Sequence, residues 1–158
     1  MNIQLRKLND LDVGSFISWM NDESVLSLAT GTSENFLESD LRKCFSKMIN
    51  SSKDFHYAIT LNDRAIGFAS LIEDRYGGHK MQLMIGDKDC WAKGYDMEAV
   101  RQLVEKAREL NNVKVYLEIR PESERSIAAF ASYGFIPTKN KRYPKDGHFP
   151  RALKMELS

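Results

Sequence analysis

The stretch CWAKGYDMEAV, residues 90–100, combines small residues and a lysine with the start of a predicted helix. Gly94 and Ala92 let a ligand approach the backbone closely. A helix N-terminus carries unpaired N–H groups and a partial positive charge, and Lys93 adds a full charge beside them. The pattern favours an anion site, although a glycine before an ordinary helix, with Asp96 as a first-turn acid, fits the same residues.

Glu118 is the candidate for acid–base chemistry. It lies in VKVYLEI, residues 113–119, where β-branched residues predict a strand. Alternation along a strand puts it on the same face as Tyr116, Lys114 and Arg120. A partly buried carboxylate at this place could take the proton of an attacking amine, whereas a carboxylate paired with Lys114 or Arg120 would be structural. The residues alone leave both interpretations open.

The hydrophobic pattern predicts the framework that positions these residues. Strands are predicted at residues 3–8, 55–61, 65–74, 80–86, 113–119 and 151–157, and helices at residues 9–22, 36–50, 94–111 and 123–134. Short turns make the second to fourth strands an antiparallel meander. The strands on either side of the long helix should pair in parallel or lie splayed within one mixed sheet. We therefore expect an α/β (α+β) fold, a single domain over residues 1–158 with a mostly antiparallel sheet flanked by helices.

The composition excludes several classes of protein. A chain of 158 residues with 42% hydrophobic and 28% charged residues suits one domain with a sizeable core. A net charge of +1 disfavours nucleic-acid binding, and no apolar run approaches the ~18 residues of a membrane span. The distant Cys44 and Cys90 fit a reducing compartment, and no apolar signal segment precedes them. We expect a cytoplasmic protein with neither nucleic-acid nor membrane partners, and the scattered His56, His79 and His148 predict no metal site.

Three segments resemble one enzyme family, in order and at its spacing. IGDKDCWAKGYDMEA, residues 85–99, is similar to the acetyl-CoA loop I-G-x-x-x-x-W-G-K-G-Y-A/G-x-E-A of the ribosomal-protein and amino-sugar branch of the GNAT superfamily of N-acetyltransferases. SERSIAAFASYGF, residues 123–135, resembles the superfamily segment N-x-x-A/S-I-x-x-Y-x-x-x-G-F, and FISWMNDESV, residues 16–25, resembles its tryptophan-containing first helix. The resemblance covers nearly the whole chain. It implies the GNAT fold and transfer of an acetyl group to a primary amine by direct attack in a ternary complex.

The resemblance also implies a binding site for acetyl-CoA and no metal. In this family the strand before the loop offers backbone groups to the pantetheine arm, and the loop amides hold the pyrophosphate. The residues carried over are Leu83, Met84 and Ile85 for the arm, and Trp91, Ala92, Lys93, Gly94, Tyr95, Asp96 and Met97 for the phosphates.

Four residues depart from the family pattern. Ala92 replaces the first loop glycine, which is a mild change if the local φ is negative. Asp96 replaces a small residue, and two unit charges ~5 Å apart at an effective dielectric of ~20 repel by roughly 3 kcal/mol unless water screens them or Asp96 turns away to cap the helix. Ser123 replaces an asparagine that often contacts the cofactor. Phe130 stands where a tyrosine usually protonates the departing thiolate, and phenylalanine cannot donate a proton.

Other residues could supply the missing proton transfers. Tyr143, in a predicted loop, and Tyr133 are the alternatives for the general acid. Glu118 matches a glutamate that serves as base in ribosomal-protein alanine acetyltransferases. Other branches use a glutamate on the fourth strand, where this chain has Lys80 or Gln82.

The acceptor is not identified by the sequence. Glu73 and Asp74 could bind an amine or form a solvated strand end, and the basic stretch Lys139–Arg151 could bind an anionic acceptor or form a solvated loop. Protein N-termini, ribosomal proteins, amino sugars, polyamines and antibiotics all stay open, as does the oligomeric state, a homodimer included. Phe130 and Asp96 also motivate two alternatives to an enzyme, a CoA-binding or regulatory module and an interaction domain that retains only the fold.

Overall fold

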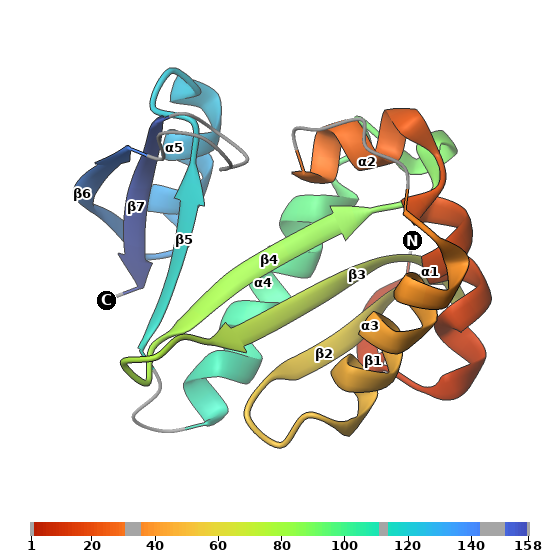
Figure 1. The fold of residues 1–158 in the computed structure, drawn as a ribbon. Coiled ribbons are helices and arrows are strands. Elements are labelled where there is room, and N and C mark those ends of the chain that lie inside the picture. The colour runs from red at the N-terminus through yellow and green to blue at the C-terminus, as the bar shows by residue number, and fades with distance from the viewer. Residues whose placement is uncertain (1, 31–35, 111–113, 143–150, 158) are drawn as a thin grey trace.

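The computed structural model describes residues 2–30, 36–110, 114–142 and 151–157. Their strands form one seven-stranded sheet in the order β1-β2-β3-β4-β5-β7-β6 (Figure 1). The strands are β1 (Ile3–Lys7), β2 (Phe55–Leu61), β3 (Arg64–Glu73), β4 (His79–Ile85), β5 (Val115–Ile119), β6 (Phe135–Arg142) and β7 (Arg151–Leu157). Neighbouring strands run antiparallel except β4 and β5. The predicted α/β fold with a mixed, mostly antiparallel sheet is confirmed.

The predicted meander is formed by β2, β3 and β4. Asn62 and Asp63 make the first turn with φ angles of 50° and 70°. Two consecutive residues with positive φ are typical of the tight hairpin turn that matches the twist of its strands, and Asn and Asp tolerate this conformation.

The sheet opens between β4 and β5. These parallel strands pair at only two positions, His79 with Val115 and Lys80 with Tyr116. Beyond Lys80 the strands diverge, so that β4 and β5 form the two arms of a V in Figure 1. The sequence left open whether these strands pair in parallel or lie splayed, and the structure combines a short parallel pairing with a splay.

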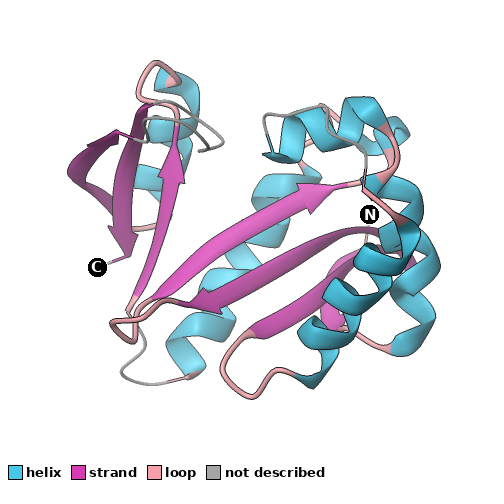
Figure 2. Ribbon diagram, viewed as in Figure 1, coloured by secondary structure: helices cyan, strands magenta, loops and turns pink. Residues whose placement is uncertain are grey.

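Helices cover both faces of the β1–β4 half (Figure 2). The helix α4 (Tyr95–Glu109) buries an apolar stripe against one face, with Val100 and Leu103 at its centre. On the opposite face α1 (Val13–Met20) and α3 (Glu38–Asn50) enclose a second cluster around Phe16, Phe45 and Phe68. The helix α5 (Glu124–Ser132) lies beside the β5–β7–β6 half. In β2, Tyr57 and Ile59 pack in the first cluster and Ala58 between them packs in the second, as alternation along a strand requires.

The prediction for residues 9–22 was too simple. The segment divides into a short 3-10 helix η1 (Asp10–Asp12) and α1, and a separate helix α2 (Glu23–Thr30) follows. Asn9 caps η1, since its side chain accepts a hydrogen bond from the amide of Leu11. The sequence allows either Asn9 or Asp10 as the cap of this segment, and Asn9 caps the single turn of η1.

The strand β6 was missed by the sequence analysis, which treated residues from Lys139 onward as loop. In its sequence FIPTKNKR, Phe135 is deeply buried and the next five residues, Ile136 to Asn140, are exposed whether apolar or polar. Edge strands often carry charged side chains, lysine especially, because charge discourages pairing with other chains. Such a strand lacks the apolar alternation on which its prediction depends.

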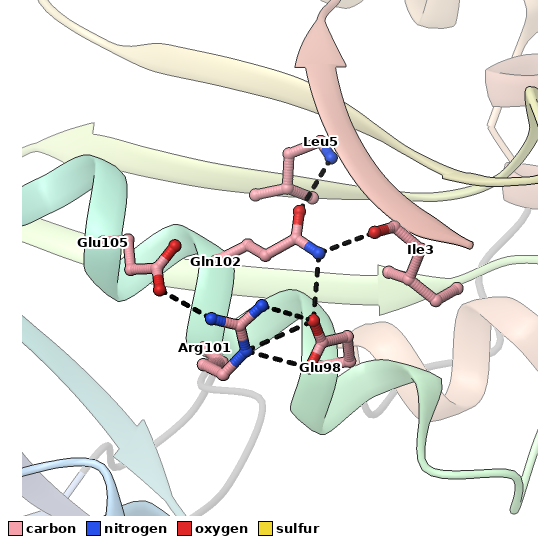
Figure 3. Close-up of polar contacts among 6 residues, drawn as sticks. All are labelled: Ile3, Leu5, Glu98, Arg101, Gln102 and Glu105. Carbon is pink, nitrogen blue, oxygen red and sulfur yellow. Dashed lines mark hydrogen bonds and ion pairs between the residues drawn. The ribbon is translucent and has the colours of Figure 1, made fainter. Parts of the chain in front are cut away.

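At the other edge of the sheet, a side chain of α4 bonds to the backbone of β1 (Figure 3). The Gln102 amide nitrogen donates to the carbonyl of Ile3 at 2.6 Å, and the amide of Leu5 donates to the Gln102 side-chain oxygen at 3.2 Å. Arg101 bridges Glu98 and Glu105 on the same helix. The helix that begins at the glycine loop is thus fixed to the far edge of the sheet.

Candidate functional site

The glycine loop lies between the end of β4 and the start of α4, at the open end of the V. A short 3-10 helix η2 (Lys88–Cys90) leads into it. The indole nitrogen of Trp91 donates to the carbonyl of Ile85 at 2.8 Å, which ties the loop back to its strand. The next three residues, Ala92, Lys93 and Gly94, are exposed.

Two loop residues adopt the left-handed backbone conformation. Gly94 has a φ of 79° and precedes the first turn of α4, and Ala92 has a φ of 61°. The condition under which Ala92 would be a mild replacement, a negative φ, is therefore not met. A residue with a Cβ in this region costs roughly 1–2 kcal/mol relative to the right-handed conformation, whereas glycine does not.

The N-terminus of α4 has no side-chain cap among the residues that the structure describes. Asp96 is exposed and makes no capping bond, so the expectation that it could turn back to cap the helix is wrong. Glu98 is engaged by Arg101, whose hydrogen bond lowers the pKa of Glu98 despite some burial. The first-turn amides and the helix dipole therefore form an exposed position that suits an anion, and Lys93 precedes this position in the loop.

Two of the three motif segments meet at Gly86. A Cβ added to Gly86 would lie 2.0 Å from the indole of Trp19 in α1, closer than atoms can pack. Trp19 in turn packs edge-on against Phe68, with ring centroids 5.0 Å apart. The amide of Gly86 donates to the carbonyl of Ile66 on β3. This contact explains why a tryptophan in the first helix and a glycine before the loop occur together.

The end of β4 lines the arm of the V that leads to the loop. Leu83 packs against the α4 cluster, Met84 against the α1–α3 cluster, and Ile85 is buried. All three lie beyond Lys80, the last position at which β4 pairs with β5. This segment therefore borders the gap between the strands.

Glu118 lies on the other arm and is almost fully enclosed. Its side chain is 6% exposed, and its carboxylate lies 3.6 Å from the Lys80 ammonium and 3.9 Å from that of Lys141. These lysines come from β4 and β6, whereas the sequence pointed to Lys114 and Arg120 as partners. The contact with Lys80 crosses the V, so Glu118 stands between its two arms.

A cavity of about 360 Å³ adjoins Glu118 at the closed end of the V. The described residues that line it are Asp74, Arg75, Tyr76, Tyr116, Lys139, Lys141 and Lys154. The Tyr116 hydroxyl donates to Asp74 at 3.1 Å, and burial together with this bond raises the pKa of Tyr116 to about 12. Asp74 also accepts from the amides of Tyr76 and Gly78, so this carboxylate shapes the β3–β4 turn. Of the two predicted acids, Asp74 borders the cavity and Glu73 does not line it.

The remaining predicted site residues that the structure describes, Ser123 and Phe130, lie at the start of α5 and within it. Ser123 precedes the helix, and its hydroxyl donates to that of Ser126 at 2.9 Å. Phe130 packs edge-on against Phe135 of β6, with centroids 5.8 Å apart. The helix ends at Ser132, and Gly134 follows the C-cap residue Tyr133 with a φ of 98°. Tyr143 and His148 lie outside the described residues.

One polar group was not anticipated from the sequence. The Nδ1 atom of His56 lies 2.6 Å from the Ser70 hydroxyl, and Nε2 lies 3.7 Å from Asp54. Burial lowers the pKa of His56, although Asp54 opposes this effect. Only the pairing of β2 with β3 brings His56 and Ser70 together, so sequence spacing gave no signal. In the described part of the chain no group of three potential ligands could hold a metal, and no helix could span a membrane.

Comparison with known proteins shows which family and which solved structures this chain resembles. The model of the acetyltransferase (GNAT) domain matches residues 2–136. Similar solved structures include a Vibrio cholerae spermidine N-acetyltransferase in complex with CoA and spermine, which is 18% identical, with 98% of this chain and 94% of that chain covered at a TM-score of 0.79. They also include the aminoglycoside acetyltransferase AAC(6')-Ib in complex with ribostamycin and coenzyme A, which is 19% identical, with 100% and 94% covered at a TM-score of 0.79. No curated protein matches the sequence.

A third similar structure is a domain from Methanocaldococcus jannaschii DSM 2661, 18% identical, with 99% of this chain and 97% of that chain covered at a TM-score of 0.74. At such identities the structures establish the fold alone. The family model, in contrast, extends from β1 to the start of β6 and includes the glycine loop. The chain belongs to the GNAT acetyltransferase family.

Proposed function

We propose that this protein transfers the acetyl group of acetyl-CoA, the cosubstrate of its family, to a primary amine by direct attack in a ternary complex. The observation that carries the proposal is the uncapped N-terminus of α4 at the open end of the splayed strands. An anion-binding helix end and a gap that accommodates an extended arm are what a nucleotide-linked thioester requires.

The residues of the loop divide the work of binding. The amides from Trp91 to Met97 and the Lys93 side chain hold the pyrophosphate, and the segment Leu83–Ile85 borders the pantetheine arm. Backbone N–H groups of β4 that face the gap polarise the thioester carbonyl. Ser123, which precedes α5, and Phe130 within α5 are proposed to contact the cofactor as well, because they match the family positions.

Glu118 is proposed as the base that takes the proton of the attacking amine, directly or through water. Its burial and its place between the arms support this role, while Lys80 and Lys141 hold its carboxylate. No donor for the departing thiolate is assigned at Phe130, and Tyr143 stays the candidate from the sequence. Glu118→Gln should lower kcat/KM by about 10²-fold or more without changing the Kd of acetyl-CoA. An unchanged kcat/KM would refute the base role.

A thermal-shift titration with acetyl-CoA, with ATP as the control, tests the binding site itself. A ligand at 100 times its Kd adds about 2.7 kcal/mol to the free energy of unfolding. For a domain of this size that raises Tm by roughly 8 °C. A saturable shift given by acetyl-CoA and CoA and not by ATP is expected, and its absence at millimolar ligand would rule the site out.

A second candidate is a CoA-binding module without turnover, which lacks the group that protonates the departing thiolate. The specific observation is that Phe130, at the usual position of the general acid, is held against Phe135. This candidate predicts normal acetyl-CoA binding with no acetylation across a broad panel of amines.

Two further expectations from the sequence remain predictions. They are membership of the ribosomal-protein and amino-sugar branch of the family, and a cytoplasmic location. Both cysteines, Cys44 and Cys90, are unpaired, which suits a reducing compartment.

A further inference from the structure

The sheet face that carries Glu118 is rich in lysine. Strand register places Lys154 of β7 opposite Glu118 and Lys139 of β6 opposite Lys154, and Lys80 lies opposite Tyr116. These side chains come from four strands, which become neighbours only in the folded sheet.

The cavity beside Glu118 has an excess of positive charge. Its described lining holds four basic side chains, from Arg75, Lys139, Lys141 and Lys154, and one carboxylate, from Asp74. That carboxylate is already engaged by two backbone amides and by the Tyr116 hydroxyl. Two of the four basic side chains pair with carboxylates outside the lining, Lys154 with Glu156 at 3.3 Å and Lys141 with Glu118 at 3.9 Å. Arg75 and Lys139 are the lining cations without a carboxylate ion pair among the described residues.

Lys141 and Lys154 are held in place over the Tyr116 ring, whereas Lys139 is exposed. The Lys154 ammonium lies 4.4 Å from the centre of the Tyr116 ring, and that of Lys141 lies 5.8 Å from it. The Lys154 side chain is 21% exposed and that of Lys141 is 29% exposed. Ammonium groups that are partly desolvated and positioned over an aromatic face form a built surface for an anion.

Lys141 connects the cavity with the reacting centre. It lines the cavity and lies 3.9 Å from the Glu118 carboxylate. A molecule whose anionic group contacts the lysines of this cavity therefore needs only a short spacer to reach the proposed base. A polycationic acceptor would place further ammonium groups against these lysines, and like charges at close range disfavour binding.

We propose that the acceptor is a small amine that carries a carboxylate or phosphate group. The anionic group binds in the cavity lined by Tyr116 and the lysines, while the amine faces Glu118. The inference rests on the proposed function and gives its acceptor a chemical class. It distinguishes this chain from the proteins in the similar structures, whose amine ligands are spermine and aminoglycosides.

Matched pairs of amines test the charge preference. β-Alanine is compared with β-alanine amide, 2-aminoethyl phosphate with ethanolamine, and spermidine serves as the cationic acceptor. Release of CoA thiol measures turnover. The anionic member of at least one pair should have a kcat/KM about 10-fold or more above that of its neutral partner, as expected for a hydrogen bond to a charged group. The two pairs separate carboxylate from phosphate recognition, and preference for the neutral members or spermidine would overturn the proposal.

Variants identify the side chains responsible. Lys139→Gln and Lys154→Gln should each raise the KM of the preferred anionic amine several-fold, leaving the KM of its neutral partner and of acetyl-CoA unchanged. Lys43→Gln, at an exposed position of α3, is the matched control and should change none of these constants. An equal change for charged and neutral amines would show a structural effect and refute the recognition role.

Binding separates this inference from the proposed function. If no amine is acetylated, titration of 2-aminoethyl phosphate, β-alanine and their neutral partners into CoA-saturated protein decides the matter. Tighter binding of an anionic member, reduced by Lys154→Gln, supports the inference, and equal or weaker binding overturns it. Failure of acetyl-CoA to bind at all would instead overturn the proposed function.

Discussion

The two halves of the sheet differ in how they are covered. The β1–β4 half is enclosed on both faces, by α4 on one side and by α1 and α3 on the other. The β5–β7–β6 half presents lysines and Tyr116 on the face that carries Glu118. The enclosed half fixes the glycine loop by apolar packing, whereas the basic half is specified by charges on separate strands. The proposed cofactor site and the proposed acceptor site therefore rest on different kinds of interaction.

Gly86→Ala should cause the largest loss of stability, because it disrupts side-chain packing in the enclosed half. The added methyl group would overlap the Trp19 indole, and overpacking of a core typically costs about 1–3 kcal/mol. We expect a loss near 3 kcal/mol in the free energy of unfolding, measured by urea denaturation. Gly14→Ala in α1 is the control, since no atom lies within 4 Å of its added Cβ. The control should stabilise by up to about 1 kcal/mol, and equal losses in both variants would contradict the packing account.

Gln102→Met tests the fixation of α4 to the sheet edge. The variant keeps the volume of the side chain and removes both bonds to β1, at a cost of about 1–2 kcal/mol. Amide hydrogen exchange at Ile3 to Lys7 should accelerate more than exchange in β3. Glu105→Gln removes only an exposed ion pair with Arg101 and should change stability by less than about 0.5 kcal/mol. Unaltered exchange in β1 would show that Gln102 does not protect the edge.

Much of the enclosed half was predictable and much of the basic half was not. The meander, the splay and the loop follow from apolar periodicity, turn residues and a local motif. The strand β6 could not be recognised, because FIPTKNKR lacks alternation. The contacts of Glu118 with Lys80 and Lys141 depend on the register of strands far apart in the sequence. The positive φ of Ala92 was also hidden, since alanine rarely adopts it.

Asp96→Ala should have a smaller effect, which is confined to the affinity of the loop for acetyl-CoA. Removing an exposed negative charge next to the anion site should tighten acetyl-CoA binding by about 3- to 10-fold, since water already screens much of the repulsion. Isothermal titration of acetyl-CoA measures the change. Glu105→Ala, further along the same helix, is the control and should leave the Kd unaltered. Weaker binding by Asp96→Ala would mean that the carboxylate supports the loop.

His56 predicts the smallest effect, a dependence of stability on pH in the enclosed half. Burial lowers the pKa of His56 in the folded protein, so the folded state favours the neutral ring. Its contribution is complete above the ordinary pKa of about 6.5 and is lost as the pH falls below that value, because the unfolded chain then binds the proton more readily. Tm should fall less between pH 7 and pH 5 in His56→Gln than in the parent protein. Parallel curves for the two proteins would exclude His56 as the cause.

The two outer strands have a common consequence for self-association. β1 has part of its edge occupied by the Gln102 side chain, and β6 carries alternating lysines at positions 139 and 141. Open strand edges are templates on which a second chain can add, and both devices oppose such addition. Lys139 and Lys141, which are proposed to select the acceptor, thus also oppose the addition of further strands to the sheet. Variants that lose these lysines should therefore aggregate more readily as well as change the acceptor preference.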